Sequence, residues 1–171
     1  MPSANLEIKA RCGDLDSARE RAERVATARV GVDVQTDTYF RVPQGRLKLR
    51  ESSLSGGQLI PYLRPDARGP RQSDYQVIPV PDPDATRALL EAILGRHRVV
   101  RKRREIFLYQ NVRIHLDAVD GLGSFLELEA VFDGSAAGLV EQQRKIDFLM
   151  RELGVDPDDL VDVSYEGLLG P

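Results

Sequence analysis

The stretch "VRIHLDAVDGLGSFLELEAVF", residues 112–132, contains two strand-like runs separated by the turn signal "DGLG". Successive side chains of a strand point to opposite faces. The polar side chains of the first run therefore share one face, opposite the aliphatic ones; they are Arg113, His115 and Asp117. In the second run, Glu127 and Glu129 share a face in the same way. The stretch predicts an antiparallel hairpin with one aliphatic face and one ionic face.

The same alternation recurs in four more runs along the chain. They are "NLEIKA" at 5–10, "RLKLR" at 46–50, "YLR" at 62–64 and "VVRKRREIF" at 99–107. Their polar positions are Glu7, Lys9, Arg46, Lys48, Arg50, Arg64, Lys102 and Arg104. Basic residues gather in the middle runs, and acidic residues gather in the first run and in the hairpin at 112–132. The ionic face therefore has a cationic sector and an anionic sector.

Other patterns predict the helices and the remaining strands. Apolar residues at helical spacing indicate helices within 13–31, 82–95, 136–153 and, as a short terminal helix, 156–170. Asp14 and Asp84 are the expected N-caps of the first two helices, with Gly31 and Gly95 near their ends. Further strands are expected at 34–42, 58–66 and 73–80. The chain thus predicts an α+β fold of about eight mostly hairpin-connected strands, in one domain over residues 1–171.

Composition limits the classes of partner. Of the 171 residues, 42% are hydrophobic and 30% are charged, which is ordinary for a globular protein. The formal net charge of -3 gives no general attraction for nucleic acid or acidic membranes. The sequence has no apolar run of about 20 residues and no signal-peptide pattern. We therefore expect a cytoplasmic protein without nucleic-acid or membrane partners. One cysteine, Cys12, and two histidines argue against a zinc cluster.

Two arrangements would explain the ionic face. An open sheet could expose it to water, which favours intermixed charges of both signs. Alternatively, eight strands can close into a small barrel with helices outside and the ionic face inside. Enclosed charges need partners of opposite sign, so a polyanion would satisfy the basic sector and a divalent cation the acidic one. Carboxylates such as Glu127 and Glu129, about 7 Å apart on one strand face, favour Mg²⁺ or Mn²⁺ over zinc.

In order and spacing, five segments resemble the CYTH family of triphosphate tunnel metalloenzymes. They are "NLEIKA", "RLKLR", "VRKRR", "HLDAVDGLGSFLELE" and "SYEGLL". The likeness runs over about residues 3–169 and is greatest to the branch that contains class IV adenylate cyclases. It implies an eight-stranded antiparallel β-barrel, a triphosphate tunnel, with helices packed outside. It also implies a bound triphosphate and one or two divalent cations, Mg²⁺ or Mn²⁺.

The resemblance assigns roles to the ionic residues. The ExExK signature of the family matches Glu7 and Lys9, whereas its first Glu is Asn5 here, which leaves the number of cations open. The implied metal ligands are Glu7, Glu127 and Glu129. The implied phosphate-binding residues are Lys9, Lys48, Arg50, Arg64, Lys102 and Arg104. Lys9, Asp117 and Arg104 are the expected catalytic residues, with Asp117 orienting a ligand or the nucleophile.

Three functions fit these features. The first is a cyclase that converts ATP to cyclic AMP and pyrophosphate, which the likeness to the cyclase branch favours. The second is a triphosphatase acting on tripolyphosphate, nucleoside triphosphate or thiamine triphosphate. The third is a non-catalytic binder of triphosphate or polyphosphate that lost turnover with Asn5. The resemblance also implies a homodimer formed through the outer helices.

A few residues have simpler expected roles. His115 is expected either to carry a proton or to bond a neighbouring acid in the interior. Arg46 and Arg113 are expected at the rim of the barrel. Tyr165 is expected to anchor the terminal helix.

Overall fold

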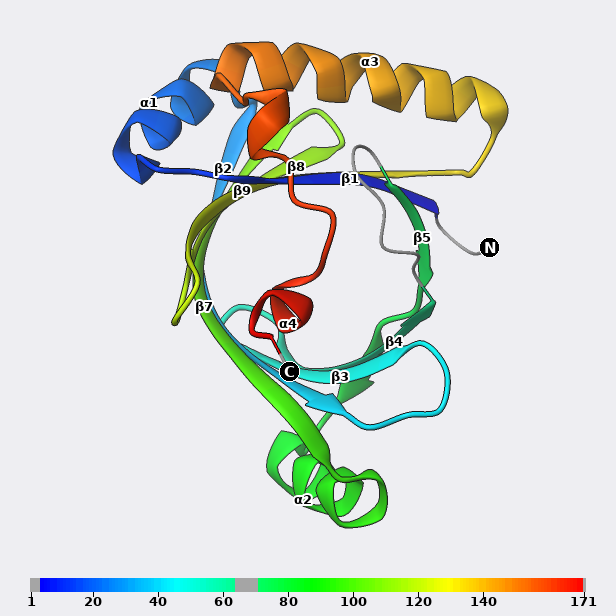
Figure 1. Ribbon diagram of the computed structural model, residues 1–171. Helices are drawn as coiled ribbons and strands as arrows, with labels where there is room; N and C mark the ends of the chain where they lie inside the picture. Colours follow the sequence, from blue (N-terminus) through cyan, green and yellow to red (C-terminus); the bar gives the residue numbers. More distant parts are fainter. Residues whose placement is uncertain (1–3, 64–70, 171) are drawn as a thin grey trace.

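The computed structural model describes residues 4–63 and 71–170 and consists of an antiparallel sheet curled into a barrel with helices around it (Figure 1). The strands are β1 (Ala4–Arg11), β2 (Ala28–Phe40), β3 (Arg46–Ser52), β4 (Gly56–Leu63), β5 (Arg71–Tyr75), β6 (Ile78–Val80), β7 (Arg96–Tyr109), β8 (Val112–Val119) and β9 (Gly123–Phe132). Their order is β3-β2-β7-β8-β9-β1-β5-β4, with β6 after β4. Because β4 also pairs with β3, eight strands form a closed ring. The predicted eight-stranded barrel is confirmed.

The short strand β6 lies outside this ring. The sequence predicts one strand over 73–80, whereas the structure divides it into β5, which pairs with β1 and the end of β4, and β6, which pairs with the beginning of β4. A Cβ atom on Gly57 would lie 2.5 Å from the backbone oxygen of Val80. The close approach of β6 to β4 therefore requires glycine at this position.

The predicted hairpin at 112–132 forms β8 and β9. In its register, Arg113 lies opposite Glu129 and His115 lies opposite Glu127. The turn contains Gly121 with a φ of 74°, a conformation that glycine adopts without steric cost. The alternation predicted from the sequence thus places the aliphatic face outside, beneath helices, and the ionic face inside the barrel.

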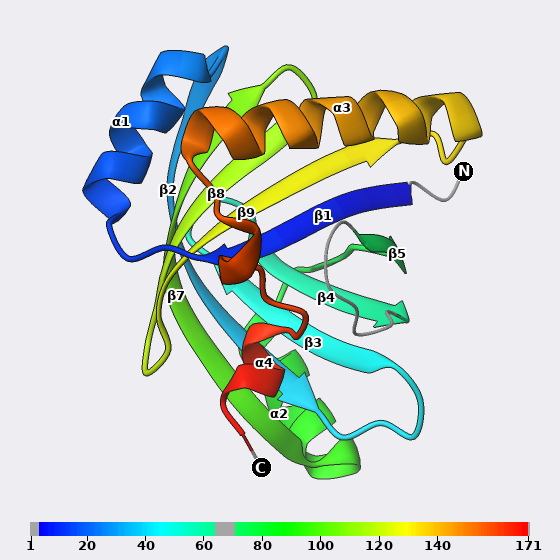
Figure 2. The same ribbon diagram turned by 45° about the horizontal axis from the view of Figure 1, so that its top comes forward.

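Four α-helices occur in the described ranges. They are α1 (Leu15–Val25), α2 (Pro83–Leu94), α3 (Ala136–Leu153) and α4 (Tyr165–Leu168), with a 3₁₀ turn at Pro157–Asp159. Helices α1 and α3 cover the outer face of the sheet around β1, β8 and β9 (Figures 1 and 2). The main hydrophobic core lies in this interface and includes Ile8, Phe107, Leu128, Ile146 and Leu149. None of the helices described is long and apolar enough to cross a bilayer.

Helix α1 is shorter than predicted. Asp14 is its N-cap, as expected, and accepts the backbone N–H groups of Asp16 and Ser17. The helix ends at Val25 instead of near Gly31. The reason is that the chain from Ala28 onward already pairs with β7 as the first part of β2. Strand pairing therefore overrides the helical pattern in this segment.

The N-cap of helix α2 lies two residues before the predicted cap. The N-cap is Asp82, whose side chain accepts the backbone N–H of Ala85 at 2.9 Å. Pro83 occupies the first helical position, where a missing N–H costs nothing. The predicted cap, Asp84, lies in the first turn instead, and the expected stop at Gly95 is confirmed.

The segment after α3 returns to the barrel and crosses one of its openings (Figures 1 and 2). Leu160 forms an isolated bridge with Ala10, and the N–H of Val161 donates to the carbonyl oxygen of Lys9 at 2.8 Å. Tyr165 then packs against Phe125 in a second hydrophobic cluster. The terminal segment therefore covers one end of the barrel interior.

Candidate functional site

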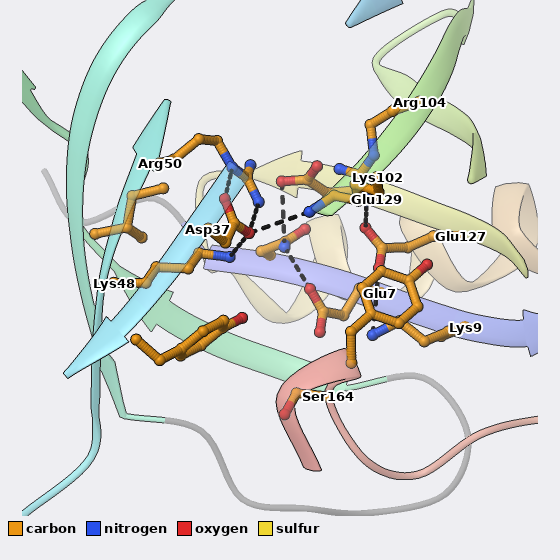
Figure 3. Close-up of a pocket in the computed structure, with 14 residues that line it drawn as sticks. Glu7, Lys9, Asp37, Lys48, Arg50, Lys102, Arg104, Glu127, Glu129 and Ser164 are labelled. Atoms are coloured by element: carbon orange, nitrogen blue, oxygen red, sulfur yellow. Dashed lines mark hydrogen bonds and ion pairs between the residues drawn. The ribbon is translucent and has the colours of Figure 1, made fainter. Parts of the chain in front are cut away.

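The barrel encloses a pocket of about 700 Å³, including its solvent-filled mouth, with a largely ionic lining (Figure 3). Of the predicted site residues in the described ranges, all line this pocket except Asp117. Asp117 is fully buried behind Arg104, and Arg64 lies outside the described residues. The structure therefore brings the acidic and basic sectors of the sequence into one cavity.

The acidic wall is formed by neighbouring positions of β1 and β9. Glu7 lies opposite Glu129 in the strand register. The Nδ2 atom of Asn5 donates to Glu7 Oε2 at 3.1 Å and lies 3.4 Å from Glu129 Oε1. Asn5 is only 2% exposed, and its Oδ1 has no hydrogen-bond partner in the described structure. The amide thus links two carboxylates and directs a buried oxygen that can still accept an interaction.

Glu127 is surrounded by basic groups. Its Oε1 lies 3.2 Å from Arg104 Nη2 and 3.2 Å from His115 Nδ1, and its Oε2 lies 3.6 Å from Lys9 Nζ. Burial alone would raise the pKa of the Glu127 carboxyl, but Arg104 and Lys9 hold it well below its usual range. His115 thus bonds a neighbouring acid inside the barrel, one of the two roles expected for it.

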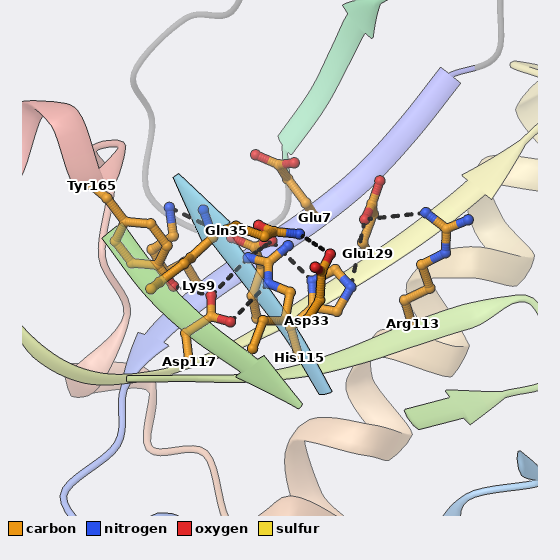
Figure 4. Close-up of polar contacts among 12 residues, drawn as sticks. Glu7, Lys9, Asp33, Gln35, Arg113, His115, Asp117, Glu129 and Tyr165 are labelled. Carbon is orange, nitrogen blue, oxygen red and sulfur yellow. Dashed lines mark hydrogen bonds and ion pairs between the residues drawn. The ribbon is translucent and has the colours of Figure 1, made fainter. Parts of the chain in front are cut away.

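Asp117, which Figure 4 shows near Tyr165, forms a bidentate ion pair with Arg104. Arg104 donates from Nε and Nη2 to the two carboxylate oxygens, each at 2.7 Å. The Tyr165 hydroxyl donates to Asp117 Oδ2 at 2.6 Å. Burial, together with Asp117 and Glu127, raises the pKa of Tyr165 well above its usual value. Tyr165 therefore connects the terminal segment to the ionic network, beyond the anchoring role expected for it.

The basic wall is organised by Asp37, which sequence reasoning missed. Arg50 donates from Nε to Asp37 Oδ1 and from Nη2 to Oδ2, each at 2.7 Å. Lys48 and Lys102 both donate to Oδ2 at 3.1 Å. The signal was present in the run "VQTDTYF", where Asp37 is the charged residue at the centre of a strand, but the run shows no adjacent cation.

These contacts keep Asp37 ionised, while burial lowers the pKa of both lysines. Burial alone would raise the pKa of the Asp37 carboxyl, but Arg50, Lys102 and Lys48 hold it well below its usual range. Burial and Arg50 lower the pKa of Lys48 to about 7, although Asp37 acts in the opposite direction. Burial likewise lowers the pKa of Lys102 to about 8, again against the effect of Asp37. Both lysines therefore titrate in the neutral to mildly alkaline range.

Two arginines of the ionic runs lie at the edge of the site. Arg46 pairs with Glu166 of α4 at 3.1 Å, and His97 Nε2 lies 3.2 Å from the same carboxylate. Arg113 is about half exposed and lies 4.0 Å from Glu129. The structure therefore places both near the rim, and Arg46 helps to hold the terminal segment over the opening.

The donor set suits a hard divalent cation, although the expected ligands do not form a ready cluster. Within residues 4–63 and 71–170, no three His, Cys, Asp or Glu side chains are grouped closely enough to bind a metal. Glu127 is occupied by Lys9, Arg104 and His115. Glu7, Glu129 and the unpartnered Oδ1 of Asn5 are oxygen donors of the kind that Mg²⁺ and Mn²⁺ prefer.

A closed antiparallel barrel with an ionic interior defines the class of protein, and comparison with known families identifies it. The chain matches the CYTH domain over residues 3–165, so it belongs to the CYTH family. This confirms the resemblance inferred from the sequence. CYTH triphosphate tunnel enzymes generally depend on divalent metals.

Individual relatives are similar over nearly the whole chain. "Putative adenylate cyclase MJ0240" of Methanocaldococcus jannaschii is 25% identical, over 96% of this chain and 98% of its own length. Adenylate cyclase CyaB of Aeromonas hydrophila is 26% identical, over 95% of this chain and 87% of its own length. The solved structure of the PH1012 protein from Pyrococcus horikoshii superposes with a TM-score of 0.84 at 25% identity, covering 96% of this chain and 98% of that one.

Proposed function

We propose that this protein is a divalent-metal-dependent enzyme that acts on a triphosphate inside the barrel, with conversion of ATP to cyclic AMP and pyrophosphate as the first candidate reaction. One observation carries the proposal. Three cations converge on Asp37 in the same pocket as the carboxylates of Glu7, Glu127 and Glu129. A phosphate chain bound with a divalent cation complements both halves of this pocket.

The basic residues would bind and orient the phosphate chain. Arg50 and Arg104 supply planar guanidinium groups that match phosphate oxygens, and the ammonium groups of Lys48 and Lys102 supply point charges. Lys9, whose Nζ lies 4.0 Å from the centre of the Tyr165 ring, approaches from the acidic side. Because the terminal segment covers one opening, it would also limit the access of water to the reacting phosphate.

The acidic residues would hold the cation. Glu7 and Glu129, linked through Asn5, present oxygens to one part of the pocket, and Glu127 would join them once its basic partners engage phosphate. A bound Mg²⁺ or Mn²⁺ would neutralise charge that develops on the phosphate oxygens. Asp117 holds the Arg104 guanidinium in place through two hydrogen bonds, so its role in this chain is to orient that group.

The cyclase and triphosphatase reactions need the same phosphate site. In the cyclase, the ribose 3′-hydroxyl attacks the α-phosphorus and pyrophosphate departs. In the triphosphatase, water attacks the terminal phosphorus instead. The names of the two curated relatives, "Putative adenylate cyclase MJ0240" and "Adenylate cyclase CyaB", favour the first reaction. The non-catalytic alternative is a protein that binds triphosphate without turnover, and the absence of a carboxylate at position 5 favours it.

Product analysis separates these functions. The protein is incubated with ATP, GTP or tripolyphosphate in Mg²⁺ or Mn²⁺, and the products are separated by anion-exchange chromatography. Cyclic nucleotide with pyrophosphate is the expected result; orthophosphate would identify a triphosphatase, and tight binding without product would identify a binder. The double variant Glu127→Ala, Glu129→Ala should lose metal dependence, whereas the exposed Glu141→Gln should not. An unchanged double variant would contradict the proposed site.

We also propose three properties of the whole protein. The first is a single domain over 1–171, the second is a homodimer formed through the outer helices, and the third is the absence of a nucleic-acid partner. Sedimentation analysis with and without DNA tests the second and third, because the expected result is a dimer mass that DNA leaves unchanged.

A further inference from the structure

Asp37 is the one carboxylate that the described residues place against all three cations of the basic wall. It is 1% exposed and projects from β2, which lies between β3 and β7 in the sheet. Its register partner on β3 is Arg50, while Lys48 on β3 and Lys102 on β7 each lie one diagonal step away. A side chain on the central strand can therefore contact cations from both neighbouring strands at once.

The cluster keeps donors for a further anion. One carboxylate against two ammonium groups and one guanidinium leaves a formal charge of about +2 when all are ionised. Asp37 accepts hydrogen bonds from Nε and Nη2 of Arg50. Within the described structure, the Nη1 atom of Arg50 is therefore not directed to Asp37. A phosphate oxygen can therefore bind this cluster while Asp37 stays in place.

We propose that Asp37 is a positioning residue for phosphate binding: it orients Lys48, Arg50 and Lys102 toward the pocket and, as the carboxylate they share, supports their positive charge for the phosphate chain. This inference rests on the proposed function, because it concerns the binding of the same substrate. Asp37 acts through the cations and need not contact the substrate itself.

The surrounding charges explain why the lysines need this carboxylate. Arg50 from β3 and Arg104 from β7 both disfavour a proton on Lys102, while Asp37 from β2 and Asp117 from β8 favour it. Lys48 faces Arg50 and Lys102 as unfavourable neighbours and Asp37 as the favourable one. Without the Asp37 charge, both lysines should release their protons at lower pH. Binding of a polyanion should then weaken as the pH rises above neutrality.

The test is the pH dependence of tripolyphosphate binding without metal. Calorimetric titrations in EDTA compare Asp37→Asn with the wild type at pH 6.5 and pH 8.5, and the ratio of the two dissociation constants cancels the ionisation of the ligand. We expect Asp37→Asn to bind tripolyphosphate within about threefold of the wild-type affinity at pH 6.5. At pH 8.5 we expect its dissociation constant to be about tenfold or more above that of the wild type, since one unit of pKa is a factor of ten. Loss of structure alone would not produce this pH dependence.

Asp33→Asn is the matched control. Asp33 is also a buried acid on the inner face of β2, but its partners are the neutral Gln35, Ser52 and Ser53. The tripolyphosphate dissociation constant of Asp33→Asn, divided by that of the wild type, should be the same at both pH values. A ratio for Asp37→Asn that does not change with pH, or an equal change for Asp33→Asn, would overturn the inference.

Asp37→Glu provides a second arm that keeps the charge. We expect it to bind tripolyphosphate with the pH dependence of the wild type, and it decides the matter if Asp37→Asn does not fold. If Asp37→Glu showed the pH dependence that is expected of Asp37→Asn, the inference would be overturned. Failure of the wild type to bind tripolyphosphate would instead refute the proposed function, and this inference with it.

Discussion

Glu127 shows how a buried acid stays ionised inside the barrel. Removing a carboxylate from water is costly, and a lone acid would take up a proton instead. Arg104, Lys9 and His115 surround Glu127, and Asp37 and Asp117 are each paired with guanidinium groups in the same way. The interior therefore carries fixed charges of both signs before a ligand binds. These carboxylates and guanidinium groups are therefore already charged when a phosphate and a cation bind.

The stability of the protein without ligand should rise with pH between 7 and 8.5. The pKa of Lys48 is about 7 and that of Lys102 is about 8 in the folded protein, but about 10.4 in the unfolded chain. The unfolded state thus binds more protons in this range, and stability rises with pH, by on the order of 2 kcal/mol. Urea unfolding at several pH values measures the change.

Lys48→Gln is the control for this prediction. This substitution removes the titration of Lys48, which contributes more to the pH dependence than that of Lys102. The stability of the variant should therefore rise less over the same pH range. A free energy of unfolding that stays flat or falls in the wild type would contradict the lysine assignments.

At the scale of elements, the terminal segment joins the helical layer to the ionic interior. It pairs with β1 through Leu160 and Val161, and α4 then places Tyr165 against Asp117. Glu166 ties the same helix to Arg46 of β3 and His97 of β7. A helix as short as Tyr165–Leu168 has little stability of its own. These side-chain contacts therefore hold it over the opening.

Tyr165→Phe should weaken this attachment while keeping the ring in its hydrophobic cluster. The loss of one hydrogen bond to a charged acceptor should cost about 1.5–3 kcal/mol of unfolding free energy. Differential scanning calorimetry against the wild type measures the loss. Tyr109→Phe is the matched control. Tyr109 stacks on Phe148, so this substitution should lower the unfolding free energy less than Tyr165→Phe does. Equal losses in the two variants would argue against the bond to Asp117.

The docking of β6 on β4 gives a second prediction at this scale. Gly57→Ala would place a methyl group 2.5 Å from the backbone oxygen of Val80, and backbone cannot move aside easily. We expect a loss of about 1–3 kcal/mol. Gly13→Ala, which meets nothing within 4 Å, should be nearly neutral. Thermal unfolding of both variants tests this, and a tolerated Gly57→Ala would show that β6 can shift.

At the scale of the whole molecule, ring closure turns separated sequence runs into one site. The period-2 alternation was sufficient to predict which side chains share a face, because it depends only on local backbone geometry. The neighbours of Asp37 were not predictable in this way, since they depend on the strand order β3-β2-β7. The caps show the same limit, because "DPD" at 82–84 offers two acids at the start of α2. Helical pattern alone likewise could not reveal that residues after Ala28 pair with β7.

The interior of the barrel, and no outer surface, is expected to bind the triphosphate. Calorimetric titration with tripolyphosphate tests it most directly in Arg50→Gln and Lys102→Gln, which remove inner cations, and in Arg101→Gln, an exposed neighbour on the outer face of β7. We predict about tenfold to a hundredfold weaker binding for the inner variants, as expected for a lost charged hydrogen bond, and wild-type binding for Arg101→Gln. Equal affinity in all three variants would show that the triphosphate does not bind inside the barrel.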